Sequence, residues 1–290
     1  MGLKLAVVVS FLDEAEHLPT LLESMDSQTR PPEQLVLVDD GSRDASPEIA
    51  AAFCDGRPWV RLVQRPIRPP SKDRLVSAPE IQAFSAGLES LWEPWDIAVK
   101  LDGDLQLGAE LFEEIRGRFA ANPRLGITGP ELSAIQPDGS LRTEHKPSHH
   151  VRGATKCYRR ECHEQIAPMP ATLGWDTIDE LRARERGWET ESFAPASDPC
   201  IHLRPTGNHD GRLRWYRRWG LCAWVYGAHP LWVVLGSVYR MRDRPYVLAG
   251  LNYLWGWIQA ALQRYPRAEP AVRAQAQKEQ LRELRERLTP

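Results

Sequence analysis

The first half of this chain alternates short apolar runs with segments that have helical patterning, and this alternation limits the possible folds more than any other feature. The strand-like runs, rich in Val, Leu and Ile, are residues 3–9, 34–40, 59–64 and 96–102. Runs of this kind are typical of strands buried on both faces. Helix-patterned segments separate them, for example from Leu18 to Met25, where apolar residues recur at helical spacing. The order predicts an α/β fold with a mostly parallel sheet flanked by helices.

The following residues continue with shorter elements. The "QPDGS" turn predicts a hairpin over 132–143, and "HHVRGATKCYRRE" resembles a strand that enters a helix. We expect a helix over 172–187 and short strands in "WETESF" and "CIHLRP". These segments extend the first domain, which we assign to residues 1–205.

Charge and cysteine content exclude several classes of protein. The formal net charge of the 290 residues is -2, so no global field would recruit nucleic acid. Five scattered cysteines are an odd number and fit reduced thiols in the cytoplasm better than a disulfide framework. The N-terminal apolar run is short and soon followed by Asp13 and Glu14, so we interpret it as a strand and not as a signal peptide.

Composition changes after about residue 215, and we assign residues 206–290 to a second, helical region rich in aromatic residues. Six of the 11 tryptophans and six of the seven tyrosines lie between Trp215 and Tyr265. Two runs without charged residues, 219–239 and 245–263, are each long enough to span a bilayer as one helix. Arginines border both runs, which favours helices in the interface at the inner face of the cell membrane, as a peripheral or monotopic attachment. A spanning hairpin, a buried helical subdomain and a dimer face are the alternatives.

Acidic residues lie where two of the predicted strands end. Asp39 and Asp40 close one strand, and Asp102 and Asp104 close another with Gly103 between them. Carboxyl ends of parallel strands meet at one edge of a sheet, where ligands of such folds bind. A solvated Asp-Gly turn is the alternative for the second pair. Converging carboxylates otherwise indicate a bound cation.

Several motifs in order resemble the family 2 glycosyltransferases, which have the GT-A nucleotide-sugar-binding fold. They are "VVVSFLDEAEHLPTLLESMDSQTRPPEQLVLVDDGSRD", "KLDGDLQL" and "GWDTIDELRARERGWET". The last of them, with "HVRGATKCYRRE", is similar to a bacterial subgroup of that family. In the first motif only Glu14 is retained, and "GRLRW" has Gly211 where processive synthases have glutamine. The resemblance therefore implies transfer of a single sugar.

The resemblance also implies roles for individual residues. Glu14 and Asp39 would contact the nucleotide, with Asp39 accepting a hydrogen bond from the base. Asp40 would either join them or hold Gly41 and Ser42 in an Asx turn. Asp102 and Asp104 would hold Mg²⁺ or Mn²⁺ against the donor diphosphate, because hard cations prefer carboxylate and phosphate oxygens.

Further residues have two interpretations each. His202 would be an additional metal ligand or a structural histidine. Lys72, in a basic loop, and Arg152 would contact the diphosphate or remain solvated surface residues. Asp176 matches the position of the family's catalytic base, which takes the proton of the acceptor hydroxyl. Asp179, one helical turn later, would orient either Asp176 or the acceptor. Capping of the helix is the alternative for Asp176.

We expect an inverting, metal-dependent glycosyltransferase that moves one sugar from a nucleotide diphosphate sugar to a glycan or lipid-linked acceptor of the cell envelope. An inactive scaffold of a glycan assembly pathway and a nucleotidyltransferase are the alternatives. The second would usually carry a glycine-rich phosphate loop after the first strand, and "SFLDEAEH" has none.

Overall fold

The computed structural model describes residues 2–68, 77–136, 138–143, 149–204 and 211–288, which divide into two compact units. The first unit comprises Met1–Ala171 and Gly187–Pro205, and the second comprises Thr172–Arg186 and Thr206–Pro290. One segment that precedes the expected boundary at residue 205 therefore belongs to the second unit. Thr172–Arg186 groups with the C-terminal helices because its helix shares an apolar core with them.

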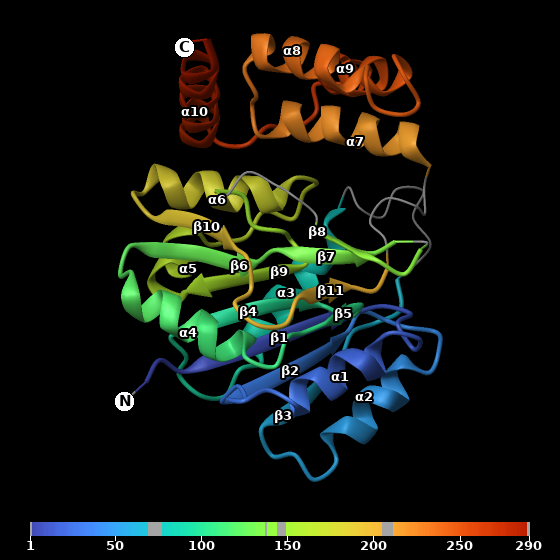
Figure 1. Ribbon diagram of the computed structural model, residues 1–290, viewed down its shortest axis with the longest axis vertical. Coiled ribbons are helices and arrows are strands. Elements are labelled where there is room, and N and C mark those ends of the chain that lie inside the picture. The colour runs from blue at the N-terminus through green and yellow to red at the C-terminus, as the bar shows by residue number, and fades with distance from the viewer. Residues whose placement is uncertain (1, 69–76, 137, 144–148, 205–210, 289–290) are drawn as a thin grey trace. The chain divides into compact units, whose positions relative to one another are not determined.

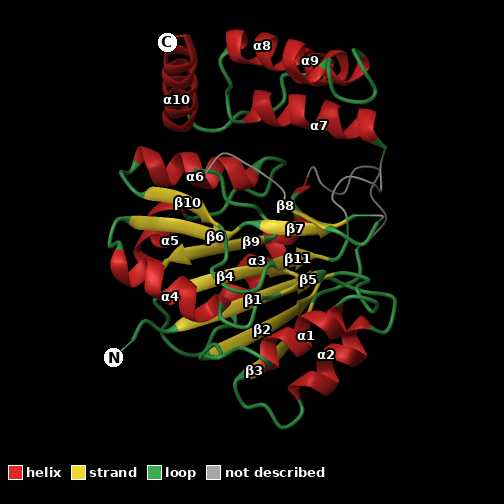
Figure 2. Ribbon diagram, in the orientation of Figure 1, coloured by secondary structure: helices red, strands yellow, loops and turns green. Residues whose placement is uncertain are grey.

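The first unit is built around a seven-stranded, mainly parallel sheet (Figures 1 and 2). Its strands in spatial order are β10 (Glu189–Phe193), β6 (Leu125–Pro130), β9 (Thr155–Arg159), β4 (Ile97–Asp102), β1 (Leu5–Phe11), β2 (Gln34–Asp39) and β3 (Val60–Gln64). Strand β9 runs antiparallel to β4 and β6, while β1 is parallel to β2 and β4. The predicted α/β class with a mostly parallel sheet is confirmed.

A smaller sheet lies beside the main one in the first unit. It consists of β5 (Leu105–Gln106), β11 (Cys200–His202), β7 (Leu132–Ile135) and β8 (Leu141–Thr143). The β7 and β8 strands form the predicted antiparallel hairpin. Strand β11 pairs with β5 so that His202 lies opposite Leu105. This pairing brings the "CIHL" segment to the residues that directly follow Asp104.

Helices cover both faces of the main sheet. They are α1 (Leu18–Asp26), α2 (Ser46–Cys54), α3 (Pro79–Glu89), α4 (Leu111–Ala121) and α5 (Arg160–Ile166). Alternate residues of β1, such as Val7, share a core with buried residues of α1, α2 and α4. On the opposite face α3 lies so close that a Cβ at Gly87 would be 2.3 Å from Val8 Cγ1. The resulting layers are those expected when parallel strands are buried on both sides.

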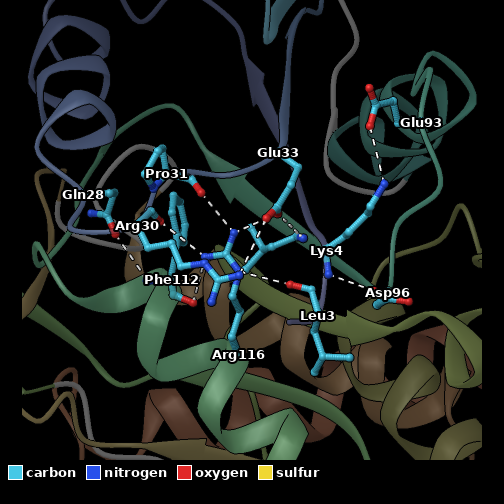
Figure 3. Close-up of polar contacts among 11 residues, drawn as sticks. Leu3, Lys4, Gln28, Arg30, Pro31, Glu33, Glu93, Asp96, Phe112 and Arg116 are labelled. Carbon is cyan, nitrogen blue, oxygen red and sulfur yellow. Dashed lines mark hydrogen bonds and ion pairs between the residues drawn. The ribbon is translucent and has the colours of Figure 1, made fainter. Parts of the chain in front are cut away.

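A buried arginine joins the segments at the amino end of β1 (Figure 3). The Arg116 side chain is 4% exposed and donates hydrogen bonds to the carbonyl oxygens of Leu3, Arg30, Pro31 and Phe112. Its Nη2 also lies 2.8 Å from the Glu33 carboxylate. The planar guanidinium therefore binds three loop carbonyls together with the carbonyl of Phe112 in α4.

The second unit is entirely helical in its described part. Its helices are α6 (Trp175–Glu185), α7 (Arg212–Val225), α8 (Pro230–Arg240), α9 (Leu248–Leu262) and α10 (Pro270–Leu288). Tyr216 and Tyr253 are buried in a core that α7, α8 and α9 share. Ion pairs join α6 to the region of α10, with 2.5 Å between Arg182 Nε and Glu269 Oε1. Many of the aromatic residues thus form the core of a helical subdomain, as one alternative proposed.

The first charge-free run is divided between two helices, while most of the second, 245–263, forms the single 15-residue helix α9. The first, 219–239, is divided between α7 and α8 by a turn that includes Gly227, where φ is +80°. Among the described residues, none of the helices combines the length and the hydropathy required to cross a membrane.

Candidate functional site

Predicted site residues gather at the carboxyl edge of the main sheet. In the register of the parallel strands, Ser10 lies opposite both Val38 and Asp102, and Phe11 lies opposite Asp39. Asp39 and Asp102 therefore end the two neighbours of β1. Glu14 follows β1 at the same edge and is 8% exposed. Ligands bind at this edge in folds of this type.

Gly103 allows the loop after β1 to approach the second acidic pair. A Cβ at this position would lie 2.7 Å from Phe11 Cβ and 3.2 Å from Glu14 Cγ. Both contacts are shorter than ordinary van der Waals distances. The glycine between Asp102 and Asp104 is thus required by the packing of Glu14 and is more than a turn residue.

Asp104 meets two basic side chains that lie far away in the sequence. Its Oδ2 is 3.4 Å from His202 Nε2 and 3.9 Å from Arg204 Nε. Burial alone would raise the pKa of Asp104, but the hydrogen bond and charge of His202 and the charge of Arg204 outweigh it, so the pKa lies below its usual value. Asp104 is therefore held as a carboxylate.

Glu14 has the opposite electrostatic environment. It forms an ion pair with Arg204, but burial and the nearby charge of Asp104 raise its pKa to about 7 despite that partner. Asp102 contributes a further, smaller increase in the pKa. Arg204 was not among the predicted site residues, although its position two residues after His202 on the same segment was a usable signal.

Asp102 interacts with a buried lysine and does not join Asp104 directly. The Lys100 side chain is fully buried, and its Nζ lies 2.5 Å from Asp102 Oδ1 and 2.8 Å from the carbonyl oxygen of Gly153. Lys100 and Asp102 are two residues apart on β4, so their side chains share a face. Lys100 was also missed, because a lysine within an apolar strand gives no indication of its partner.

The chemistry of these residues fits a divalent cation. Within the described ranges, no group of three or more His, Cys, Asp or Glu side chains is arranged to hold a metal ion. A cation bound mainly by substrate phosphates needs only one or two carboxylates from the protein, and Mn²⁺ also accepts imidazole nitrogen. Asp104 and His202 supply such a pair, and a cation there would offset the negative charge of Asp104, which after burial is the next largest cause of the raised pKa of Glu14. The three-residue set with Asp102 remains a prediction.

The "VDDGSRD" loop differs in one detail from the predicted roles. Asp39, and not Asp40, holds the turn, because its Oδ1 accepts hydrogen bonds from the backbone N–H groups of Gly41 at 3.2 Å and Ser42 at 2.8 Å. Asp40 instead forms ion pairs with Arg65 and Arg68. Two arginines of the basic loop are therefore engaged by Asp40 in this structure.

Hydrogen bonds connect the loops that follow β1 and β2. Ser42 Oγ accepts from the N–H of Asp13 at 3.0 Å, and Ser46 Oγ accepts from the N–H of Glu14 at 2.8 Å. In return, Asp13 Oδ1 accepts from the N–H of Arg43 at 2.7 Å. Ser46 is the first residue of α2, and its hydroxyl positions Glu14. The two loops are thus held in one arrangement.

The predicted catalytic residues lie on α6 of the second unit. Asp176 is in the first turn of the helix and half-buried, and Gly174, with φ +83°, occupies the N-cap position without a side-chain cap. Asp176 is therefore not the N-cap residue itself, and its two interpretations remain predictions. Asp179 is fully buried, and its Oδ1 accepts a hydrogen bond from the N–H of Glu180. Within this unit α6 approaches Cys222, where burial and the charge of Asp176 raise the pKa of the thiol.

Of the two basic residues predicted to contact the diphosphate, Arg152 is among the described residues and Lys72 is not. Arg152 is half-buried and directly precedes Gly153 and Ala154, whose carbonyl oxygens accept hydrogen bonds from Lys100 Nζ and from the N–H of Asp102. Its segment therefore borders the acidic pair, while a role for its side chain remains a prediction. Lys72 lies outside the described residues.

Comparisons with known proteins agree with this geometry. Residues 6–71 match the model of glycosyl transferase family 2. No curated protein matches the sequence. A mannosyltransferase from Pyrobaculum calidifontis, solved with GDP-Man and Mn²⁺, is 17% identical, with 93% of this chain and 78% of that chain covered at a TM-score of 0.54.

Other solved structures share the fold at similarly low identity. S. aureus TarS 1-349 in complex with UDP-GlcNAc is 13% identical, with 94% of this chain and 78% of that chain covered at a TM-score of 0.54. GalNAc-T7 with UDP, GalNAc and Mn²⁺ is 13% identical, with 91% and 57% covered at a TM-score of 0.60. The predicted GT-A fold class is confirmed by these similarities.

Proposed function

We propose that this chain transfers a single sugar from a nucleotide diphosphate sugar, with inversion and with the help of a divalent cation. The premise is that the chain is a glycosyltransferase, since its residues 6–71 match the family 2 model. The observation that carries the proposal is the meeting of Asp104 with His202 and Arg204 at the carboxyl edge of the sheet. The nucleotide sugars and Mn²⁺ bound to structural neighbours support a donor and a metal of these kinds.

In this proposal each residue at the sheet edge has one task. Asp104 and His202 hold the cation, which when bound neutralises charge on the leaving diphosphate. Arg204 is a second positive charge for the phosphates, available when its ion pair with Glu14 opens. Asp39 uses Oδ1 to hold its own turn, so its other oxygen is the one proposed to accept a hydrogen bond from the base.

The chemical step is a substitution at the anomeric carbon. The acceptor hydroxyl oxygen forms a new bond to the anomeric carbon. The bond between that carbon and the phosphate oxygen breaks, and the nucleoside diphosphate leaves. We assign the hydroxyl proton to the Asp176 carboxylate through the family resemblance, with Asp179 as the residue that positions it. The acceptor proposed is a lipid-linked or envelope glycan.

Thermal unfolding with a panel of nucleotide sugars tests the donor site. We expect at least one nucleotide sugar to raise the melting temperature in the presence of Mn²⁺, since a ligand at 100 times its Kd stabilises the folded state by about 2.7 kcal/mol. Asp104→Asn should abolish this shift. The matched control is Asp55→Asn, an exposed acid after α2 that should keep the shift. Absence of a shift with every donor, with Mn²⁺ or Mg²⁺, would contradict the proposal.

Asp176→Asn separates catalysis from binding. The variant should keep the Mn²⁺-dependent melting shift while release of nucleoside diphosphate in the presence of a membrane extract falls by about 10²–10⁴-fold, the usual contribution of a general base. Equal release by the variant and the wild type would show that Asp176 is not the general base. It would not contradict the proposed donor site.

A further inference from the structure

Helix α8 and the beginning of α9 expose several large aliphatic side chains in the second unit. We call the set the α8–α9 face, and its aliphatic members are Leu231, Val234, Leu235, Val238, Leu248 and Leu251. The four on α8 recur at intervals of three and four residues, so they lie along one side of the helix. Val238 is 60% exposed and Leu231 is 48% exposed. Monomeric soluble proteins seldom expose a contiguous apolar surface of this kind without a function.

The opposite side of α8 is packed against its own unit, so the exposed side is not the side with which α8 contacts the core of the unit. Val233 and Ser237 are buried, and Ser237 Oγ donates a 2.8 Å hydrogen bond to the carbonyl oxygen of Gly250 on α9. A Cβ at Gly250 would lie 2.2 Å from the carbonyl oxygen of Ser237. Helices α8 and α9, drawn in orange in Figure 1, are therefore in close contact through small residues, and the aliphatic side of α8 faces away from that contact.

Arginines and aromatic residues border this face where α8 connects to α9. The Arg242 guanidinium lies 3.8 Å from the ring centroid of Tyr239, and that of Arg244 lies 5.9 Å from the centroid of Tyr246. Both tyrosines are more than half exposed. The sequence from 219 to 263 contains one acid, Asp243, whose Oδ2 lies 3.3 Å from the Tyr216 hydroxyl. The border is therefore basic.

We infer that the α8–α9 face inserts into the interface of an anionic lipid bilayer. The aliphatic side chains suit the hydrocarbon of such a bilayer, and the tyrosines suit its headgroup region. The basic border suits its negatively charged surface. Helix α8 has 11 residues, about 16 Å, roughly half the thickness of the hydrocarbon core, so it would lie in the interface. The positive charge of the border favours a lipid surface over a second copy of this chain, because the arginines of the two copies would repel each other.

Flotation with lipid vesicles tests this inference and involves no sugar donor, so its outcome is independent of the transfer reaction. The full chain should float with vesicles that contain phosphatidylglycerol and much less with pure phosphatidylcholine. Val234→Glu together with Val238→Glu should abolish flotation. Arg242→Ala together with Arg244→Ala should weaken partitioning by about 30-fold on the anionic vesicles, since each arginine near the surface contributes a factor of about five.

The matched control is Leu141→Glu, which replaces another exposed apolar residue, 47% exposed on β8, by the same acid. It should float like the wild type. Circular dichroism and melting temperature verify that each variant is folded. Failure of the wild type to float, or flotation of the Val234/Val238 double variant, overturns the inference. A dimer in light scattering that dissociates in this double variant, without vesicle binding, would instead identify the face as a contact between copies.

Discussion

At the scale of single residues, glycines set how closely the loops of the site approach one another. Gly103 faces Phe11 and Glu14 at distances that leave no room for a Cβ. Gly41 has φ +89°, and a Cβ there would lie 2.8 Å from Ile67 Cα. One glycine thus permits the approach of the β1 loop to the acidic pair, and the other permits the turn that Asp39 holds.

Gly103→Ala tests this packing. The added methyl would push Phe11 and Glu14 away from Asp104, and we expect a loss of about 1–3 kcal/mol in the free energy of unfolding, as for other overpacked sites. Urea unfolding measures it. Gly117→Ala is the control, because nothing lies within 4 Å of that Cβ in helix α4, and it should be neutral or stabilise by up to about 1 kcal/mol. Equal effects of the two substitutions would contradict this account of Gly103.

At the scale of elements, helices α7 and α9 cross through two glycines. A Cβ at Gly220 would lie 2.0 Å from the carbonyl oxygen of Tyr253, and one at Gly256 would lie 2.0 Å from that of Arg217. The backbones therefore touch, and the aromatic side chains pack around the contact, with Trp224 and Trp257 at 5.7 Å between ring centroids. Small residues at a helix crossing permit such an approach.

Gly256→Ala should separate α7 from α9 and destabilise the second unit by about 1–3 kcal/mol. Tryptophan fluorescence and near-ultraviolet circular dichroism report on this unit because many tryptophans lie there. Gly236→Ala on α8 is the matched helical control, since the atoms nearest to its Cβ are all side-chain atoms, with the guanidinium end of Arg240 at 2.9 Å, and none is backbone. If Gly256→Ala leaves the melting temperature unchanged, the close crossing is incorrect.

At the scale of the whole molecule, the chain has separate cores in its two units, and ion pairs link distant segments within each of them. In the first unit Arg116 holds Glu33, and in the second Arg182 holds Glu269. Burial acts to raise the pKa of Glu33, but the N–H of Leu5 and the guanidinium of Arg116 outweigh it, so the pKa lies below 4.5. The sequence distance between these partners makes each pair dependent on the complete fold of its unit.

The lowered pKa of Glu33 predicts an acid-dependent contribution to stability. The carboxylate form stabilises the fold, so the contribution is complete above the unfolded-state pKa of about 4.5 and is lost as the pH falls through the folded-state pKa. In urea unfolding, the difference in free energy between the wild type and Glu33→Gln should therefore be larger at pH 7 than at pH 3. A difference that does not change with pH would contradict this assignment.

Local pattern alone was sufficient for most of the strands and for the position of the acids. The runs around β1, β2 and β4 are mostly apolar, a pattern typical of parallel strands covered on both faces, and Asp39 and Asp102 are the last residues of two of them. The hairpin of β7 and β8 was predictable from its turn residues for the same reason. These predictions depend on contacts between residues close in sequence or on the regular period of a strand.

What the sequence by itself determined is therefore the α/β class, most of its strands and the edge where the acids lie. Only the tertiary structure decided that Asp104 meets His202 and Arg204, that Asp102 turns to Lys100, and that α6 packs with the C-terminal helices. Such partners are distant along the chain, and their choice depends on how strand ends and helix faces pack in three dimensions. Periodicity indicates which face of an element is buried, but it does not indicate which distant segment covers it.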